Sequence, residues 1–313
     1  MSTEARTAFK IRNWAKYNEA LVNRFDVTFW FTEDILSQWK HENENQGQGR
    51  PFTFSDLAIE TLLTMRELFQ LPYRGTEGFG RWVLSVMQID LAIPGYTALC
   101  KRAKTLAIDL SIKKRRGKIN VIVDSTGLKV FGEGEWKTRT HGKSKRRTWR
   151  KLHLMIDADT QEIVADVLTD NSVHDSEVVS PLLKRTRNKM RRFYGDGAYD
   201  TWKVREPLEQ RGIEQVIPPQ KNAKIKRHGN SQQPRLERDD AIRNIRRYGH
   251  KGWKRRIGYH RRSLAETAMF RLKTIFGGRL KNRLIENQKA ETKIRCKLLN
   301  HFTNLGLPEY FSK

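Results

Sequence analysis

The sequence of 313 residues lacks the features that mark disulfide-rich, zinc-binding or membrane proteins. Cysteine occurs only at Cys100 and Cys296, without a C-x-x-C pair or a Cys/His cluster, which argues against a disulfide framework and a structural zinc site. No run of about 18 apolar residues is present to span a bilayer, and the first residues lack the apolar stretch of a signal peptide. We therefore expect a soluble, intracellular protein, in which Cys100 is a small buried side chain.

Two widespread catalytic motifs are absent as well. The chain contains no Gly-x-Ser-x-Gly segment, which argues against acyl-transfer hydrolysis, and no Gly-x-x-x-x-Gly-Lys-Ser/Thr loop, which argues against nucleotide hydrolysis. The eight histidines show no paired metal-ligand spacing. We interpret His153 and His174 as structural or near-site polar groups.

Basic residues are in large excess. Lys and Arg number 61 against 35 Asp and Glu, which gives a formal net charge of +26. Residues 1–100 hold 10 basic and 12 acidic residues, so the whole excess lies in residues 101–313. This charge indicates a polyanionic partner, a class that includes double-stranded DNA.

The N-terminal part of the chain is expected to be helical. Residues 1–50 form short aromatic-rich segments that end in a polar linker, and residues 51–117 form a helical region. Helices are predicted over 55–70, 76–87 and 96–110. The first of these is apolar nearly all round and should be buried.

A Pro-Gly break separates the last two of these predicted helices. The second helix is basic on its outer face, and two interpretations stay open. One is an ordinary helical hairpin with a solvated face. The other is a helix-turn-helix that places a set of polar side chains at DNA: Thr97, Lys101, Arg102 and Lys104.

A second domain, 118–313, is expected to begin where β-branched residues first cluster. The predicted strands are 119–123, 148–157, 162–168, 192–195 and 213–217, with helices over 176–187 and 201–211 and a final long helix. This order predicts an α/β fold in which a mixed sheet is flanked by helices. Residues 220–258, rich in Lys and Arg with few aliphatics, are expected to form a basic, partly disordered insertion.

Three carboxylates stand where a sheet enzyme would place them. Asp124 directly follows the strand 119–123, Asp196 follows a later strand, and Glu266 lies in the final helix. Phosphodiester cleavage is served by two Mg²⁺ ions, which bind a few carboxylates from different elements and keep several waters. Taken singly, Asp124 and Asp196 also fit turns or caps.

Two other acidic segments are predicted to be structural. Asp157-Ala-Asp159 lies between two strand-like runs and is interpreted as a hairpin turn. Asp175-Ser-Glu177 is interpreted as a helix start.

The final helix carries a line of functional side chains. At about 100° per residue, Tyr259, Arg262, Glu266 and Lys273 fall within roughly a 60° arc, opposite the apolar side. This predicts a metal ligand flanked by phosphate-binding groups. The alternative is a solvated face with an Arg262–Glu266 ion pair. Gly258 also allows the helix to begin after Tyr259.

Together these positions resemble a known signature. They are Tyr259-(2)-Arg262-(3)-Glu266-(6)-Lys273, with Asp124 in Val-Asp-Ser-Thr-Gly-Leu-Lys and Asp196 in Tyr-Gly-Asp-Gly-Ala-Tyr-Asp. The pattern is similar to that of the DDE transposases of bacterial insertion sequences, of insertion sequence family five and its family four-like relatives, over about residues 50–310.

The resemblance implies a ribonuclease-H-like catalytic domain that binds two Mg²⁺ ions, for which Mn²⁺ substitutes. The implied metal ligands and catalytic residues are Asp124, Asp196 and Glu266. The implied phosphate-binding residues are Tyr259, Arg262 and Lys273. It also suggests that the basic insertion holds DNA and that Trp253 stacks on a flipped base.

The sequence thus predicts a bacterial transposase in the cytoplasm, associated with the nucleoid. It would bind the terminal inverted repeats of its transposable element, cleave the ends with metal-activated water and join them to target DNA, as at least a homodimer on DNA. Two alternatives stay open: a ribonuclease-H-like nuclease or resolvase without strand transfer, and a non-catalytic DNA-binding repressor.

Overall fold

The computed structural model describes residues 9–41, 52–110, 112, 115–130, 149–228, 232 and 235–312. The chain divides into two units, which we call the first unit (residues 1–107 and 297–313) and the second unit (residues 108–296). The sequence predicted separate parts over 1–50 and 51–117, but both lie mainly in the first unit. Residues 297–313, predicted to belong to the catalytic domain, also belong to the first unit. The predicted linker over 42–50 lies outside the described residues.

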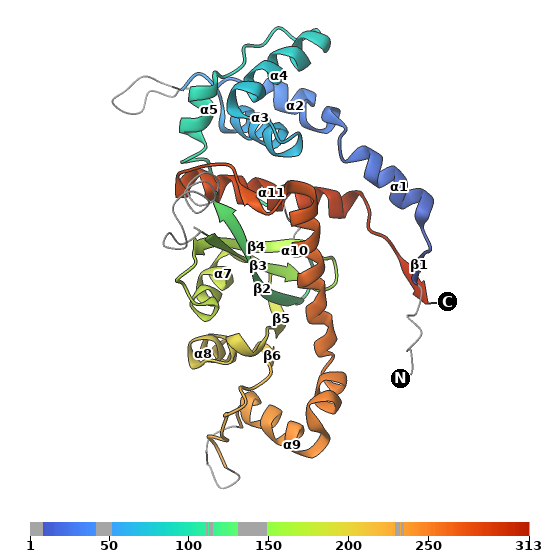
Figure 1. Cartoon of the computed structure of the whole chain (residues 1–313), viewed down its shortest axis with the longest axis vertical. Helices are drawn as coiled ribbons and strands as arrows, with labels where there is room; N and C mark the ends of the chain where they lie inside the picture. The colour runs from blue at the N-terminus through green and yellow to red at the C-terminus, as the bar shows by residue number, and fades with distance from the viewer. Residues whose placement is uncertain are drawn as a thin grey trace, which may run out of the picture. The chain divides into compact units, whose positions relative to one another are not determined.

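The first unit is largely helical. Its helices are α1 (Trp14–Asn23), α2 (Glu33–Ser37), α3 (Asp56–Leu68), α4 (Tyr73–Val86) and α5 (Tyr96–Arg102), with a 3-10 turn η1 (Val27–Trp30). It is not all-α as predicted, because strand β1 (Phe9–Ile11) pairs antiparallel with β8 (Tyr310–Ser312), as Figure 1 shows. This pairing brings the C-terminal segment into the first unit.

Helix α3 confirms the prediction of a buried helix. The Ser55 hydroxyl accepts a hydrogen bond from Ala58 N at 3.1 Å and caps its first turn. Its apolar side chains are buried on all sides: Ala58, Ile59, Leu62, Leu63 and Met65.

Helix α5 is shorter than predicted. It covers seven residues rather than 96–110, because hydrogen bonds from Lys104 N to Lys101 O and from Thr105 N to Arg102 O close its last turn. Cys100 in this helix is half-buried, not buried. At the other end, the Glu77 carboxylate of α4 accepts from Tyr96 N at 2.7 Å and fixes where α5 begins.

The second unit is built on a mixed sheet, which confirms the predicted α/β class. In the described part of the chain the sheet has six strands in the order β4-β3-β2-β5-β6, with β7 beside β2. The strands are β2 (Ile119–Val130), β3 (Trp149–Asp157), β4 (Ile163–Asp170), β5 (Met190–Tyr194), β6 (Glu214–Val216) and β7 (Arg279–Leu280). Strands β2, β3 and β4 are antiparallel neighbours, whereas β5 and β7 pair parallel to β2.

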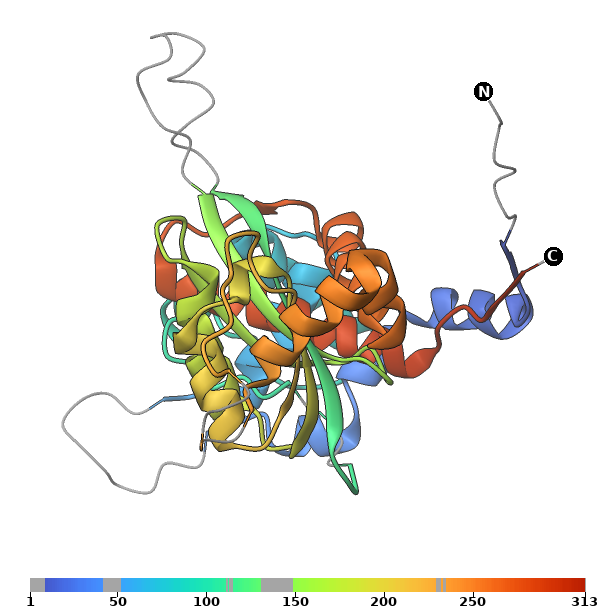
Figure 2. The same cartoon turned by 90° about the horizontal axis from the view of Figure 1, so that it is seen from below.

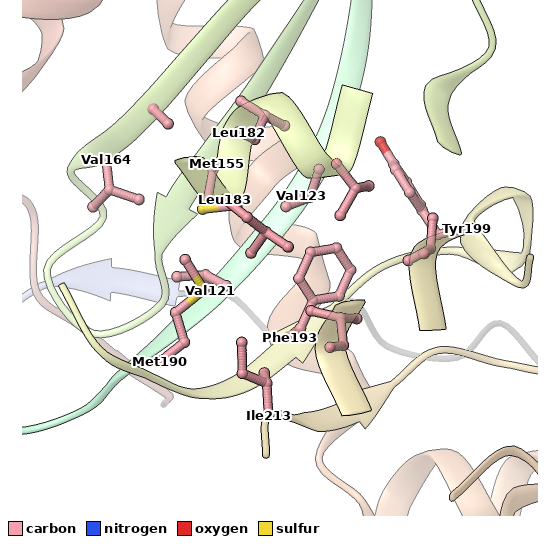
Figure 3. Packing of buried hydrophobic residues seen from close by; sticks show 14 of the residues in the cluster. Val121, Val123, Met155, Val164, Leu182, Leu183, Met190, Phe193, Tyr199 and Ile213 are labelled. Carbon is pink, nitrogen blue, oxygen red and sulfur yellow. The ribbon is translucent and has the colours of Figure 1, made fainter. Parts of the chain in front are cut away.

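Helices cover both faces of this sheet, as Figures 1 and 2 show. Helices α7 (Val179–Arg185) and α8 (Trp202–Gln210) lie on one face, and α10 (Ser263–Phe276) lies on the other. Val121 and Val123 belong to the apolar cluster under α7 and α8 (Figure 3). Because side chains alternate along a strand, Asp124 is turned to the α10 face and Ser125 to the α7 face.

The turn predicted at Asp157-Ala-Asp159 is confirmed. It joins β3 to β4, and the Asp157 carboxylate accepts from Asp159 N at 2.8 Å, an Asx-type turn. The helix start predicted at Asp175 is the 3-10 turn η2 (Asp175–Val178), which leads into α7.

The described part of the basic segment 220–258 is more ordered than predicted. Helix α9 (Glu237–Arg256) occupies its second half, with a kink at Gly249, where φ is 70°. A few buried side chains, Ala241, Ile242 and Trp253, are enough to pack it. Among the described residues no helix is long and apolar enough to cross a membrane. Helix α11 (Ile285–Leu305) precedes β8 in the chain and contributes residues to both units.

Candidate active site

Two of the three predicted carboxylates are brought together by strand register. In the parallel pair of β2 and β5, Ile122 lies opposite Tyr194, so Asp124 and Asp196 each stand two residues further along. Asp124 does not follow the end of its strand, as the sequence predicted, because β2 continues to Val130. It is β5 that ends here, and Asp196 begins the 3-10 turn η3 (Gly197–Tyr199) with its carboxylate accepting from Ala198 N at 2.8 Å.

The third carboxylate comes from helix α10, which packs against β2. Its buried side is made of Ala265, Ala268 and Leu272, and Glu266 in the first turn is exposed on the other side. The negative charge of Glu266 raises the pKa of Asp124. The structure therefore brings Glu266 into the neighbourhood of the two aspartates.

Arg262 links two of these carboxylates. Its Nη1 donates to Asp124 Oδ2 at 3.0 Å, and its Nη2 forms an ion pair with Glu266. The other oxygen, Asp124 Oδ1, accepts from the backbone N–H of Ser125 at 2.9 Å. The Arg262–Glu266 pair thus exists, but it is part of a larger charged cluster rather than an isolated surface pair.

The surroundings of Asp124 raise the pKa of its carboxyl. Burial is the largest cause that raises the pKa of Asp124, and the charges of Asp196 and Glu266 raise it further. The Ser125 N–H and the Arg262 guanidinium lower it, without reversing the net upward direction. The carboxyl of Asp124 is thus harder to ionise than a free aspartate, mainly because it is buried.

The donor set fits divalent magnesium or manganese in its chemistry, because carboxylate oxygens from separate elements are the ligands that such ions prefer. Within the described residues, no group of three or more His, Cys, Asp or Glu side chains converges closely enough to hold one ion. The guanidinium of Arg262 is bonded to Asp124 and Glu266, two of the carboxylates that would hold a cation.

Tyr259 lies next to the carboxylates, at the start of the 3-10 turn η4 (Tyr259–Arg262). The left-handed Gly258, with φ 69°, precedes it, and α10 itself begins only at Ser263. Burial raises the pKa of Tyr259, and the charges of Asp196 and Asp124 raise it further. The phenol therefore stands within electrostatic reach of both aspartates. Lys273 is exposed, two helical turns beyond Glu266.

Trp253 does not have the position that base stacking needs. Its side chain is 2% exposed, and its ring centroid is 6.0 Å from that of Tyr259. A ring packed in this way presents no face to a nucleobase, so the structure corrects the base-stacking prediction. Trp253 instead supports Tyr259, over whose ring Lys254 Nζ lies at 5.1 Å from the centroid.

The residues predicted to read DNA divide into two groups. Thr97, Lys101 and Lys104 are exposed. Arg102 is buried: it donates to Phe54 O at 2.8 Å, pairs with Asp56, and lies 4.0 Å from the Phe52 ring centroid. Arg102 is thus held within the first unit, and its predicted contact with DNA is corrected.

The sequence interpretation missed a polar group on the other face of β2. Ser125 follows Asp124, and its hydroxyl donates to Asp175 Oδ2 at 3.0 Å. Asp175 also pairs with Lys151, and the buried His153 lies beside it. His153 is thus a near-site polar group as predicted. The only sequence signal was the alternation along β2, which places Ser125 opposite to Asp124.

Comparison with known proteins gives two family matches. A family model described as "Transposase DDE domain" matches residues 115–302, and a second model with the same description matches residues 22–133. The first range is more than half of the chain and contains Asp124, Asp196 and Glu266. Among solved structures, the piggyBac transposase synaptic complex with hairpin DNA has a TM-score of 0.39 and 12% sequence identity, covering 91% of this chain and 74% of that one.

Proposed function

The chain belongs to the DDE transposase family, an enzyme class that cleaves DNA and transfers its strands, and we propose that it is the transposase of a bacterial insertion sequence. Its proposed substrate is the pair of terminal inverted repeats of that element, and its second substrate is target DNA. The observation that carries this proposal is that Asp196 and Glu266 lie within electrostatic reach of Asp124, with Arg262 paired to Asp124 and Glu266.

We propose a ribonuclease-H-like fold for the second unit. Support comes from the central position of β2, which bears the first carboxylate, from the parallel β5, which places the second, and from α10, which brings the third. The chain order of the three acids is that of the resemblance.

Asp124, Asp196 and Glu266 are the residues that would hold two Mg²⁺ ions, or Mn²⁺ in their place. When bound, such ions activate the attacking oxygen and stabilise charge on the leaving oxygen of a phosphodiester. The protein itself orients these ligands: Ser125 N–H fixes one oxygen of Asp124, and Ala198 N–H fixes one oxygen of Asp196.

Basic residues supply the binding of DNA. The planar guanidinium of Arg262 suits a phosphate, with Tyr259 beside it and Lys273 further along α10. The exposed basic side chains of α9, and Thr97, Lys101 and Lys104 of the first unit, extend the contact in this proposal. Because two transposon ends must be cut in concert, we propose at least a homodimer on DNA.

The test is an assay with Mg²⁺, a plasmid that carries the DNA flanking the gene, and a target plasmid. Wild type, Glu266→Gln and a control, Glu286→Gln, are compared; Glu286 is an exposed acid in the first turn of α11. We expect cleaved ends and joined products from wild type and control, and neither from Glu266→Gln. Cleavage without joining would favour a nuclease or resolvase. Binding without cleavage by wild type would favour a repressor.

A further inference from the structure

A half-buried carboxylate, Asp175, is held by two donors on the α7 face of the sheet. Its Oδ2 accepts from the Ser125 hydroxyl at 3.0 Å, and its Oδ1 lies 3.2 Å from Lys151 Nζ. Lys151 also donates to Val173 O at 2.9 Å, so the ammonium is fixed in place. Asp175 thus has a defined position relative to β2.

Ser125 connects this carboxylate to the metal-binding candidate Asp124. Its side chain donates to Asp175, and its backbone N–H donates to Asp124 Oδ1 at 2.9 Å. The second oxygen of Asp124 is consequently turned to Arg262. One residue therefore couples two carboxylates on opposite faces of the same strand.

The surroundings of Asp175 include a fully buried histidine. His153 stands opposite Ser125 in the register of β2 and β3, and its Nε2 lies 2.9 Å from Thr169 Oγ1. Its Nδ1 is 3.8 Å from Asp175 Oδ1 and has no hydrogen-bond partner among the described residues. Burial lowers the pKa of His153 to about 4, so the ring is neutral near pH 7. Lys151 is then the cation that neutralises Asp175.

The phenol of Tyr199 also lies within electrostatic reach of Asp175. The side chain is 1% exposed and belongs to the apolar cluster of Figure 3, where its ring packs on that of Phe193. Asp175, Asp124 and Asp196 all raise the pKa of this phenol, which places it within their electrostatic reach. Within the described structure its hydroxyl has no hydrogen-bond partner.

This set of buried polar side chains around Asp175 is poorly suited to stabilise the fold. Buried polar atoms without partners cost stability, and an apolar contact would anchor η2 to the sheet without that cost. Groups of this kind are typical of functional sites, where orientation matters more than stability. Asp175 is linked to Asp124 through a single residue, Ser125, which binds Asp175 with its hydroxyl and Asp124 with its backbone N–H.

We propose that Asp175 is a positioning residue of the active site, which acts through Ser125 to fix the carboxylate of Asp124. Lys151 holds Asp175, and the pair sets the direction of the Ser125 hydroxyl. Asp175 touches neither substrate nor metal in this arrangement. The inference rests on the proposed function, because it takes Asp124 as a metal ligand.

The test measures Mn²⁺ binding to DNA-free protein by electron paramagnetic resonance, together with the melting temperature. The variants are Ser125→Ala, Asp175→Asn and the conservative Ser125→Thr, which keeps the hydroxyl. The control is Asp170→Asn, which removes a carboxylate paired with Arg150 on the same sheet. Removing a hydrogen bond that orients a metal ligand typically weakens metal affinity about 10- to 100-fold.

We expect that loss for Ser125→Ala and Asp175→Asn, with affinity near wild type for Ser125→Thr and Asp170→Asn. If Asp175→Asn does not fold, Ser125→Ala still decides the question, since it removes a single hydroxyl. Wild-type Mn²⁺ affinity in Ser125→Ala, alone or with a lowered melting temperature, would overturn the positioning role. A wild-type protein that binds no Mn²⁺ and cleaves no DNA would overturn the proposed function, and this inference with it.

Discussion

Arg262 Nη1 lies 3.0 Å from Asp124 Oδ2, which joins the end of η4 to the central strand across 138 positions of the sequence. The same guanidinium pairs with Glu266. While the N–H groups of Arg262 are bound to both carboxylates, they are not available to bind a phosphate. The two carboxylates and the DNA phosphates therefore compete for this side chain. Binding of a divalent cation to the carboxylates would release Arg262 for DNA.

Arg262→Gln is therefore expected to bind Mn²⁺ more tightly than wild type when DNA is absent. The reason is that a charge-assisted hydrogen bond, worth about 1.5–3 kcal/mol, no longer has to be displaced, which corresponds to roughly tenfold or more in affinity. Binding of transposon-end DNA should weaken in the same variant. Calorimetric titration with Mn²⁺ and with DNA measures both.

The control for this prediction is Arg261→Gln. Arg261 is the neighbouring residue; it donates to Ala158 O at 2.9 Å and pairs with Asp159 in the β3–β4 turn, whereas Arg262 pairs with Asp124 and Glu266. Its Mn²⁺ affinity should equal that of wild type. Weaker Mn²⁺ binding by Arg262→Gln would contradict the competition.

The sequence predicted much of the site because the relevant relationships are periodic. The 3.6-residue period of a helix places Glu266 outside the buried side that contains Ala265 and Ala268, as observed. The alternation of a strand places Asp124 and Ser125 on opposite faces. The hairpin turn at Asp157 followed from local turn chemistry and is present as predicted.

What the sequence did not reveal depends on packing between distant segments. Arg102 and Trp253 are side chains that can lie either exposed or buried, and contacts with residues distant in the sequence, such as Asp56 for Arg102, decide that they are buried. The extension of β2 to Val130 depends on pairing with β3 and β7 and has no local signal. The contact between Arg262 and Asp124 is of the same long-range kind.

The burial of Trp253 leads to a stability prediction. Trp253→Ala should lower the free energy of unfolding by about 3–5 kcal/mol, the usual cost of removing a buried aromatic side chain. Trp253→Phe should lose much less and bind transposon-end DNA like wild type. Urea denaturation and a DNA-binding titration test this. A Trp253→Ala protein of wild-type stability with weaker binding of DNA would instead favour base stacking.

The buried His153 predicts a pH dependence of stability. Burial, reinforced by Lys151 and opposed by Asp175, lowers its pKa from 6.5 to about 4. Between these values the unfolded chain binds a proton that the folded protein does not, so this contribution is complete above pH 6.5 and is lost as the pH falls toward 4. The loss from pH 7 to pH 4.5 should be about 2–3 kcal/mol.

This pH dependence is measured as the free energy of unfolding in urea at both pH values. His153→Gln should show a smaller fall than wild type, and His174→Gln, an exposed histidine, should behave like wild type. An equal fall in wild type and His153→Gln would show that His153 does not titrate as described.

The exposed basic side chains of α9 predict how DNA binding responds to salt. Each phosphate contact made by a cation releases condensed counterions, and the slope of log affinity against log salt concentration changes by about 0.9 per contact. Arg246, Lys251 and Arg255 are exposed on α9, so replacing all three with Gln should make the slope shallower by about 0.9 for each residue that contacts DNA.

A matched control removes the same number of charges from the first unit, where residues 1–100 are nearly neutral overall. Lys10, Arg12 and Lys16 are exposed there, and their triple Gln variant should keep the wild-type slope. Fluorescence anisotropy of a labelled transposon end over a range of salt concentrations gives each slope. An unchanged slope for the α9 variant would mean that none of its three cations neutralises a phosphate. If the control variant then had the shallower slope, the DNA-binding surface would have to be assigned to the first unit.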